Sequence, residues 1–213
     1  METDPIPRGR RPAGAIPFVA GGLVLLWLGA AVAGQDPAPA LPGELRKGSQ
    51  EFTILLGYGE QVEVFGGAEE DREFLFFTPR WGIVLTEPLG EGFWRGGLEF
   101  LTEPSAIITA DTPRILSGGI AALLKYNFYT GTRLMPFLEG GAGLMVSTDR
   151  LQGQGSSFNF TPQVGAGFHY FFTREWAITS AYRFWHLSNA RTASPNAGVN
   201  VHSFLVGLAY FFP

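Results

Sequence analysis

Apolar and aromatic residues alternate with small or polar residues along most of the chain beyond residue 49. A period of two is that of a β-strand, because successive side chains of a strand point to opposite faces. Turn-forming residues separate the alternating segments, and no apolar run in this part is long enough for a membrane-spanning helix. The pattern predicts eight strands, near residues 50–58, 71–85, 92–103, 115–128, 134–147, 158–172, 175–188 and 200–212.

The seventh predicted strand indicates where its two faces point. Its even-numbered positions from 176 to 184 are mostly aromatic or apolar, whereas the odd-numbered positions carry small residues and Arg183. The even face is predicted to contact lipid and the face of Arg183 to line a barrel interior, because the strands of a membrane barrel alternate apolar-out and polar-in. The last segment ends in aromatic residues before Pro213, an ending that is common in outer-membrane proteins.

These features predict an all-β fold, an eight-stranded antiparallel transmembrane β-barrel of the bacterial outer membrane. A secreted β-sandwich is the alternative, since its core strands alternate in the same way. The 19 phenylalanines favour the barrel, because many aromatic residues lie on faces that a sandwich would expose to water. The glycines at two-residue spacing in Gly141-Ala-Gly143 and Gly165-Ala-Gly167 suit a narrow lumen lined by small residues.

Residues 1–33 carry the three parts of an export signal. Three arginines lie near the start, an apolar run extends from Ala15 to Ala33, and the small residues Ala31-Val-Ala33 offer a cleavage site before Gly34. A retained membrane anchor is the alternative, since the run is almost long enough to span a bilayer. The proline and glycines within the run favour the cleaved signal, because they make a poor spanning helix.

Residues 34–48 are rich in Pro, Gly and Ala and are predicted to form a flexible periplasmic lead-in to a barrel over residues 49–213. Cleavage leaves 12 basic and 17 acidic residues, a net charge of −5, so no nucleic-acid partner is predicted. The absence of cysteine excludes disulfides and thiolate metal sites. No other cluster has the spacing of metal ligands, so neither a metal nor a cofactor is expected.

Strand parity predicts that the end of the seventh strand lies at the outer surface. An even-stranded barrel with both termini in the periplasm sends its seventh strand outward, so His186 and Ser188 meet the outer leaflet. These residues are i and i+2 on the lipid-facing side, about 6.5 Å apart along the strand, which lets an imidazole reach a serine hydroxyl. The pair is a candidate base and nucleophile that would act within a lipid layer.

Two asparagines complete a candidate hydrolase site. A serine nucleophile needs a base, and the base works best when a third group fixes its tautomer. Asn200 begins the last strand beside the end of the seventh, so its side-chain oxygen is predicted to accept a hydrogen bond from His186. Asn189 is predicted to donate its amide to the oxyanion, with nearby backbone N–H groups adding to it. A chance pairing of His and Ser is the alternative, but polar groups on a lipid face are costly without a role.

The segment His186-Leu-Ser188-Asn189-Ala190, followed by Pro195-Asn196-Ala-Gly198, resembles the C-terminal signature of the lipid A 3-O-deacylase family, the PagL type. The resemblance covers the mature chain in length and strand count, and in residue detail the stretch from about 182 to 212. It implies an outer-membrane barrel that removes an ester-linked 3-O acyl chain from the lipid A of lipopolysaccharide. It also implies that His186 is the base, Ser188 the nucleophile and Asn189 the oxyanion residue.

Position 200 departs from that family's pattern, which has a glutamate where this chain has Asn200. An outward-facing His-x-Ser with an Asn as third member resembles the outer-membrane phospholipase A family instead, whose barrel is longer. Length favours the deacylase, and a phospholipase that uses calcium is the alternative. A non-catalytic barrel, structural or binding an external partner, is the alternative from another class. The expected partners are lipid A and outer-membrane lipid, and the sequence leaves homodimerisation open.

Overall fold

The computed structural model describes residues 44–64 and 72–213, so the predicted export signal over residues 1–33 lies outside the described residues. The described end of the predicted lead-in contacts the barrel. Leu45 is buried, and Glu44 forms an ion pair with Arg95 in which Oε1 and Nε are 2.5 Å apart.

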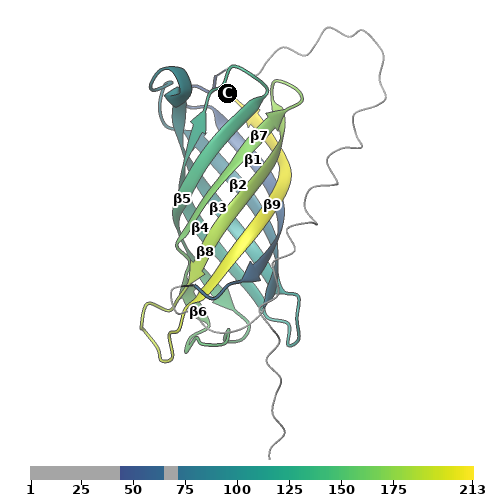
Figure 1. The fold of residues 1–213 in the computed structure, drawn as a ribbon, viewed down its shortest axis with the longest axis vertical. Coiled ribbons are helices and arrows are strands. Elements are labelled where there is room, and N and C mark those ends of the chain that lie inside the picture. The colour runs from purple at the N-terminus through teal and green to yellow at the C-terminus, as the bar shows by residue number, and fades with distance from the viewer. Residues whose placement is uncertain (1–43, 65–71) are drawn as a thin grey trace, which may run out of the picture. The chain divides into compact units, whose positions relative to one another are not determined.

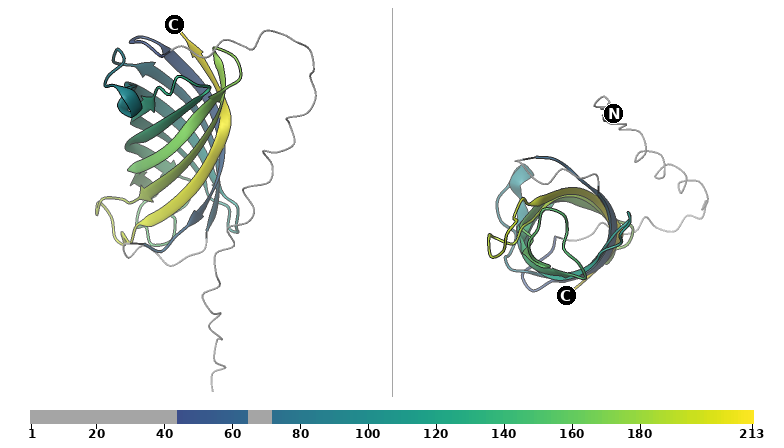
Figure 2. Two further views of the ribbon diagram at one scale, coloured as in Figure 1. Left: turned by 45° about the horizontal axis from the view of Figure 1, so that its top comes forward. Right: turned by 90° about the horizontal axis from the view of Figure 1, so that it is seen from below.

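In the two described ranges all neighbouring strands are antiparallel, and the first strand pairs with the last. A further pairing between β4 and β5 completes the ring, so the sheet closes into a barrel. Figure 1 shows the tilted strands, and the end view in Figure 2 shows the ring that they form. The elements are β1 (Gln50–Gln61), β2 (Glu73–Val84), the 3-10 helix η1 (Gly92–Trp94), β3 (Gly96–Thr109), β4 (Leu116–Phe128), β5 (Leu134–Ser147), β6 (Phe158–Phe160), β7 (Gln163–Phe171), β8 (Trp176–Leu187) and β9 (Val199–Phe212).

β6 and β7 are two parts of one barrel strand, so the predicted eight-stranded antiparallel barrel is confirmed. Phe160 pairs with Leu144 of β5, and Gln163 pairs with Gly141 in the same register. Pro162 lies between them and cannot donate to the ladder, which explains the interruption. The third strand differs most from its predicted range of 92–103, because Gly90 and Gly92 take positive φ values of 68° and 56° and turn the chain before β3 begins.

The outer surface of the barrel is apolar, as the alternation predicts. In β8 the odd-numbered positions, Arg183 among them, are buried, and the even-numbered positions are exposed or half-buried. A continuous apolar band of this kind is the lipid-contacting surface of a membrane barrel. No helix among the described residues is long and apolar enough to cross a membrane. The band includes Phe52, Leu56, Leu75, Phe77, Ile120, Leu138, Leu144, Val164, Phe168, Ile178, Phe204, Val206 and Leu208.

Charged side chains lie inside the barrel, where the sequence predicted Arg183 and otherwise small residues. Arg80 and Arg183 bridge the carboxylates of Glu103 and Glu139, with 2.7 Å between Arg80 Nη2 and Glu103 Oε2 and 2.6 Å between Arg183 Nη2 and Glu139 Oε1. These four side chains are at most 5 % exposed. Buried charges of opposite sign compensate one another only when they are paired and hydrogen-bonded, as they are here.

A second ionic group lies nearer the end of the barrel where β1 begins and β9 ends. Lys125 pairs with Glu51 and, at 2.9 Å, with Glu99, and its ammonium is 3.3 Å from Nε2 of His169. The imidazole of His169 is buried and shares a hydrogen bond of 2.8 Å with Thr179. His169 is therefore a lumen residue.

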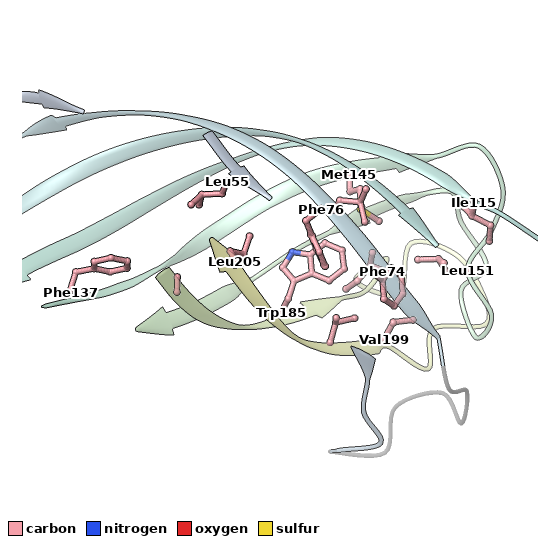
Figure 3. Close-up of a cluster of buried hydrophobic side chains, with 14 residues drawn as sticks. Leu55, Phe74, Phe76, Ile115, Phe137, Met145, Leu151, Trp185, Val199 and Leu205 are labelled. Atoms are coloured by element: carbon pink, nitrogen blue, oxygen red, sulfur yellow. The ribbon is translucent and has the colours of Figure 1, made fainter. Parts of the chain in front are cut away.

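Apolar side chains pack against these ionic groups toward the end of the barrel that carries the β8–β9 connection. The rings of Phe76 and Trp185 lie 5.7 Å apart in an edge-to-face arrangement. Leu187 and Val199, the last residue of β8 and the first of β9, belong to the same buried cluster and pair across the two strands. Figure 3 shows Phe76, Trp185 and Val199 within this cluster. The packing holds the two strand ends in place from inside.

Candidate active site

The end of β8 and the start of β9 bring three of the predicted site residues together, at the lower end of the barrel in Figure 1. His186 and Asn200 are direct partners across the two strands. Ser188 follows β8 and forms an isolated bridge with Phe160 of β6. Two antiparallel strands and a third neighbour therefore hold the residues whose side chains were predicted to meet.

The side chains of His186 and Asn200 form the hydrogen bond that the strand pairing predicted. Nδ1 of the imidazole lies 2.6 Å from Oδ1 of Asn200. The Nδ2 of Asn200 donates to the backbone carbonyl of Val64 at 2.7 Å, and Asn200 is 2 % exposed. Because the Val64 oxygen can only accept, it requires the amide nitrogen on its own side and turns the amide oxygen toward His186. His186 must then carry its proton on Nδ1, which leaves the Nε2 lone pair free to act as a base.

The backbone of Ser188 is fixed, and its hydroxyl is free. Its N–H and carbonyl both pair with Phe160, at 3.1 and 2.8 Å. Its side chain is half-buried on the same outward parity as His186. Within the described ranges the Ser188 hydroxyl makes no hydrogen bond, either to His186 or to another group. Catalytic hydrogen bonds often form only when substrate is bound, so this open geometry is compatible with a nucleophile awaiting its ester.

Gly198 lies against the imidazole of His186. Its φ is +79°, a conformation that residues with a Cβ rarely adopt. A Cβ at this position would be 2.8 Å from Cε1 of His186, closer than van der Waals contact allows. The absence of a side chain therefore gives the ring its place beside Asn200.

Asn189 lies on the inward side of the chain, fully buried, with its donors already engaged. Its side-chain Nδ2 donates to the carbonyl of Pro195 at 3.0 Å. Its backbone N–H points to two side-chain oxygens, Oδ1 of Asn196 at 2.9 Å and Oε1 of Gln154 at 3.2 Å. The structure thus brings Asn189 beside Ser188 but directs its amide away from the lipid-facing side, and its predicted oxyanion role stays a prediction.

Ala190 and Arg191, the two residues after Asn189, have backbone N–H groups without an acceptor in the described part of the chain. Ala190 and Arg191 take φ values of 52° and 64°, and the carbonyl of Asn189 accepts from the N–H of Thr192 at 3.0 Å, as in a tight turn. Positive φ in two successive residues other than glycine is strained, and such strain is concentrated at functional sites. Neither the Ala190 nor the Arg191 N–H has a hydrogen-bond acceptor among the described residues.

Among the described residues, other titratable groups do not join this site. His202 lies one pleat further along β9 on the outward face, with Nε2 at 3.7 Å from Glu60, so it stands beside the site and not within it. In the described part of the chain, no three His, Asp or Glu side chains are grouped as metal ligands. Sequence reasoning missed Val64 and Gln154, because a backbone carbonyl and a glutamine between two glycines of a polar loop carry no motif.

The profile of a family described as Lipid A 3-O-deacylase (PagL) matches residues 61–209. No curated protein was found to match the sequence. The crystal structure of the outer membrane enzyme PagL is 20% identical to this chain, with a TM-score of 0.54 over 74% of this chain and 97% of that one. The crystal structure of Neisserial surface protein A is 18% identical, with a TM-score of 0.53 over 78% of this chain and 100% of that one. At these identities the two structures establish the barrel fold alone.

Proposed function

Because the chain belongs to the lipid A 3-O-deacylase family, whose profile matches more than half of it, we propose that it is a serine esterase that removes the 3-O acyl chain of lipid A. The protein is a β-barrel of the bacterial outer membrane, where lipopolysaccharide is found. We further propose that residues 1–33 are the export signal and residues 34–48 the lead-in to the barrel. Its substrate partner is then lipid A, and homodimer formation is left to experiment.

Ser188 acts as the nucleophile and His186 as the base. As the hydroxyl oxygen attacks the ester carbonyl, Nε2 of His186 takes the hydroxyl proton and the carbonyl becomes an oxyanion. Collapse of this intermediate breaks the bond to the sugar oxygen, which leaves as an alcohol with the proton from His186. Water then attacks the acyl-serine by the same route, which releases the fatty acid and restores the serine.

The oxyanion requires donors that are fixed before the reaction. The N–H groups of Ala190 and Arg191 come two and three residues after Ser188, have no acceptor among the described residues, and lie in a strained turn. We assign the oxyanion hole to these backbone donors, with Asn189 acting through the turn that it begins. This keeps the predicted location of the oxyanion hole and shifts its donors from a side chain to the backbone.

The observation that carries this proposal is the ordered chain from Val64 through Asn200 to His186, with contacts of 2.7 and 2.6 Å. An amide as third member can present either its oxygen or its NH₂ to the imidazole, and the wrong choice fixes the wrong tautomer. The carbonyl of Val64 removes that ambiguity. An arrangement of this kind beside a serine on a lipid-facing surface supports a catalytic role, since a structural role would not need the tautomer to be selected.

The test is mass spectrometry of lipid A from outer membranes that carry the intact protein, Ser188→Ala or His186→Ala. The intact protein is expected to remove one hydroxyacyl chain and both variants none, with heat-modifiable gel mobility showing that all three are folded. The same lipid A profile for the folded intact protein and Ser188→Ala would refute the proposal.

A second candidate is a phospholipase, and the amide at position 200 is the observation that favours it. The same nucleophile, base and oxyanion donors would cleave a glycerophospholipid ester. The two activities are separated in the same experiment, because lysophospholipid would accumulate in place of deacylated lipid A. No change in either lipid would indicate a non-catalytic barrel.

A further inference from the structure

The β5–β6 connection, residues 148–157, is joined to the β8–β9 connection, residues 188–198, by backbone hydrogen bonds. Gly155 N–H donates to the carbonyl of Pro195 at 2.6 Å, and Ala197 N–H donates to the carbonyl of Gly153 at 2.8 Å. Gln154 and Asn196 form an isolated bridge between these two contacts. The two connections therefore form one small antiparallel unit at the end of the barrel that carries the candidate active site.

A buried side chain fixes this unit to the apolar cluster inside the barrel. Leu151 is 2 % exposed and belongs to the apolar cluster that also contains Trp185 and Leu187. Gly155 packs so closely on the partner loop that a Cβ there would lie 2.3 Å from the carbonyl oxygen of Ser194. A loop that is fixed by a buried leucine and by backbone contacts can position other groups accurately.

What the unit holds is the residue after the proposed nucleophile. Gln154 Oε1 and Asn196 Oδ1 accept from one and the same donor, the N–H of Asn189. Gln154 is 3 % exposed and Asn189 fully buried, so this N–H is shielded from bulk solvent. Two acceptors on a single buried donor exceed what hydrogen-bond satisfaction requires, which indicates that the direction of this peptide matters.

We propose that Gln154 and Asn196 are positioning residues for the oxyanion hole, an inference that rests on the proposed serine-esterase function. By holding the Asn189 N–H inward, they fix the start of the strained turn and turn the free N–H groups of Ala190 and Arg191 toward the oxygen of an ester bound at Ser188. The ligand of these donors is the anionic tetrahedral intermediate, so their positioning stabilises the transition state and not the ground state.

The test compares Gln154→Met with Asn196→Ala, their double variant, and Gln154→Met combined with Asn196→Asp. Aspartate keeps the Oδ1 acceptor, puts an oxygen in place of an amide nitrogen that has no partner among the described residues, and adds a negative charge. Each single variant leaves one acceptor, so a few-fold loss is expected, whereas the double variant is expected to lose about 10²-fold in kcat, the order seen for one oxyanion donor. KM should stay within about twofold, and the aspartate combination should recover the activity of Gln154→Met alone.

The matched control is Asn159→Ala, which removes a hydrogen bond of 3.2 Å to the carbonyl of Ser156 in the same loop but leaves both acceptors of Asn189 in place. This variant is expected to keep its kcat. Positioning is overturned if the folded double variant keeps its kcat within about threefold of the intact protein. It is equally overturned if Asn159→Ala loses as much as the double variant, because the effect would then be general loosening of the loop.

A second readout separates this inference from the identity of the substrate. A fluorophosphonate modifies an activated serine, and its phosphoryl oxygen occupies the oxyanion hole. If the intact protein leaves lipid A unchanged but Ser188 is labelled, the proposed function fails while the inference is judged by labelling rates. Slower labelling of the double variant, restored by the aspartate, supports positioning. Equal rates, or no labelling of the intact protein, overturns it.

Discussion

Replacing Gly198 with alanine tests whether catalysis depends on the position of the His186 ring. The new Cβ would lie 2.8 Å from Cε1, 3.6 Å from Nε2 and 3.8 Å from Nδ1 of that ring. Carbon atoms pack at about 3.5–4.0 Å, so the ring must move by about 0.7 Å or more. A shift of that size strains the 2.6 Å hydrogen bond to Asn200. Misplacement of about 1 Å can cost about 10²-fold in rate, which is the expected loss in kcat.

The same substitution also has a backbone cost that must be separated from the steric one. Alanine at a positive φ costs about 1–2 kcal/mol wherever it occurs. Gly131, in the β4–β5 turn, provides the matched control, because its φ is +69° and a Cβ there would meet no atom within 4 Å. Gly198→Ala is therefore expected to lose at least as much unfolding free energy as Gly131→Ala, while Gly198→Ala alone loses activity.

The assay follows release of the acyl chain from purified lipopolysaccharide by mass spectrometry over time, with urea unfolding in lipid vesicles as the measure of stability. Activity is compared only under conditions in which both variants are folded. If Gly198→Ala deacylates lipid A within about threefold of Gly131→Ala, displacement of the imidazole is harmless and the reasoning about His186 is wrong.

The remaining predictions concern the other residues that hold the site and the barrel. Asn200→Ala is expected to lower kcat about 10- to 100-fold in steady-state kinetics, because His186 loses the acceptor that fixes its tautomer. Glu139→Gln is expected to cost about 3–5 kcal/mol in urea unfolding and to leave kcat unchanged, because it leaves buried guanidinium charge unmatched. The hydrogen bond from Arg95 lowers the pKa of Glu44 below its ordinary value of 4.5, so its stabilisation is present above pH 4.5 and lost as the pH falls through the folded value. Glu44→Gln should therefore lower the melting temperature slightly at pH 7, and the difference should vanish in acid. Asn200→Asp is expected to bring no gain in kcat at neutral pH.

The fold could be predicted because the strands of a membrane barrel alternate apolar and polar residues with a period of two. The aromatic residues of one parity had to face lipid, and this alone set the outward direction of His186 and the inward direction of Arg183. The contents of the lumen could not be predicted in the same way. Partners such as Arg80 and Glu103 are 23 residues apart and meet only because strand stagger brings them to one level. That stagger is not visible in the periodicity of any single strand.

The site was predictable where it follows from strand pairing and not where it depends on loops. The cross-strand contact of His186 with Asn200 required only parity and adjacency. The direction of the Asn189 amide depends on a turn with two positive φ values, at residues whose types do not favour them. Asn189 could therefore be predicted from the sequence. That its backbone N–H donates to Gln154, a residue of the β5–β6 connection, could not.

The family pattern of a glutamate at position 200 suggests that an acid there should raise activity, and the structure predicts otherwise. An acid would gain from the imidazolium, by about 4 kcal/mol for unit charges 4 Å apart at an effective dielectric of 20, an upper value because His186 is half-buried. Aspartate, however, would set a carboxylate oxygen against the Val64 carbonyl where an N–H now donates at 2.7 Å. Leaving that partly buried carbonyl unmatched costs up to about 1–3 kcal/mol, and desolvation of the carboxylate costs several more. The terms are of similar size, so kcat of Asn200→Asp should not exceed that of the intact protein in steady-state kinetics at pH 7. An increase of about 100-fold would show that the hydrogen bond to the Val64 carbonyl is not needed for catalysis and that the amide at position 200 lowers kcat.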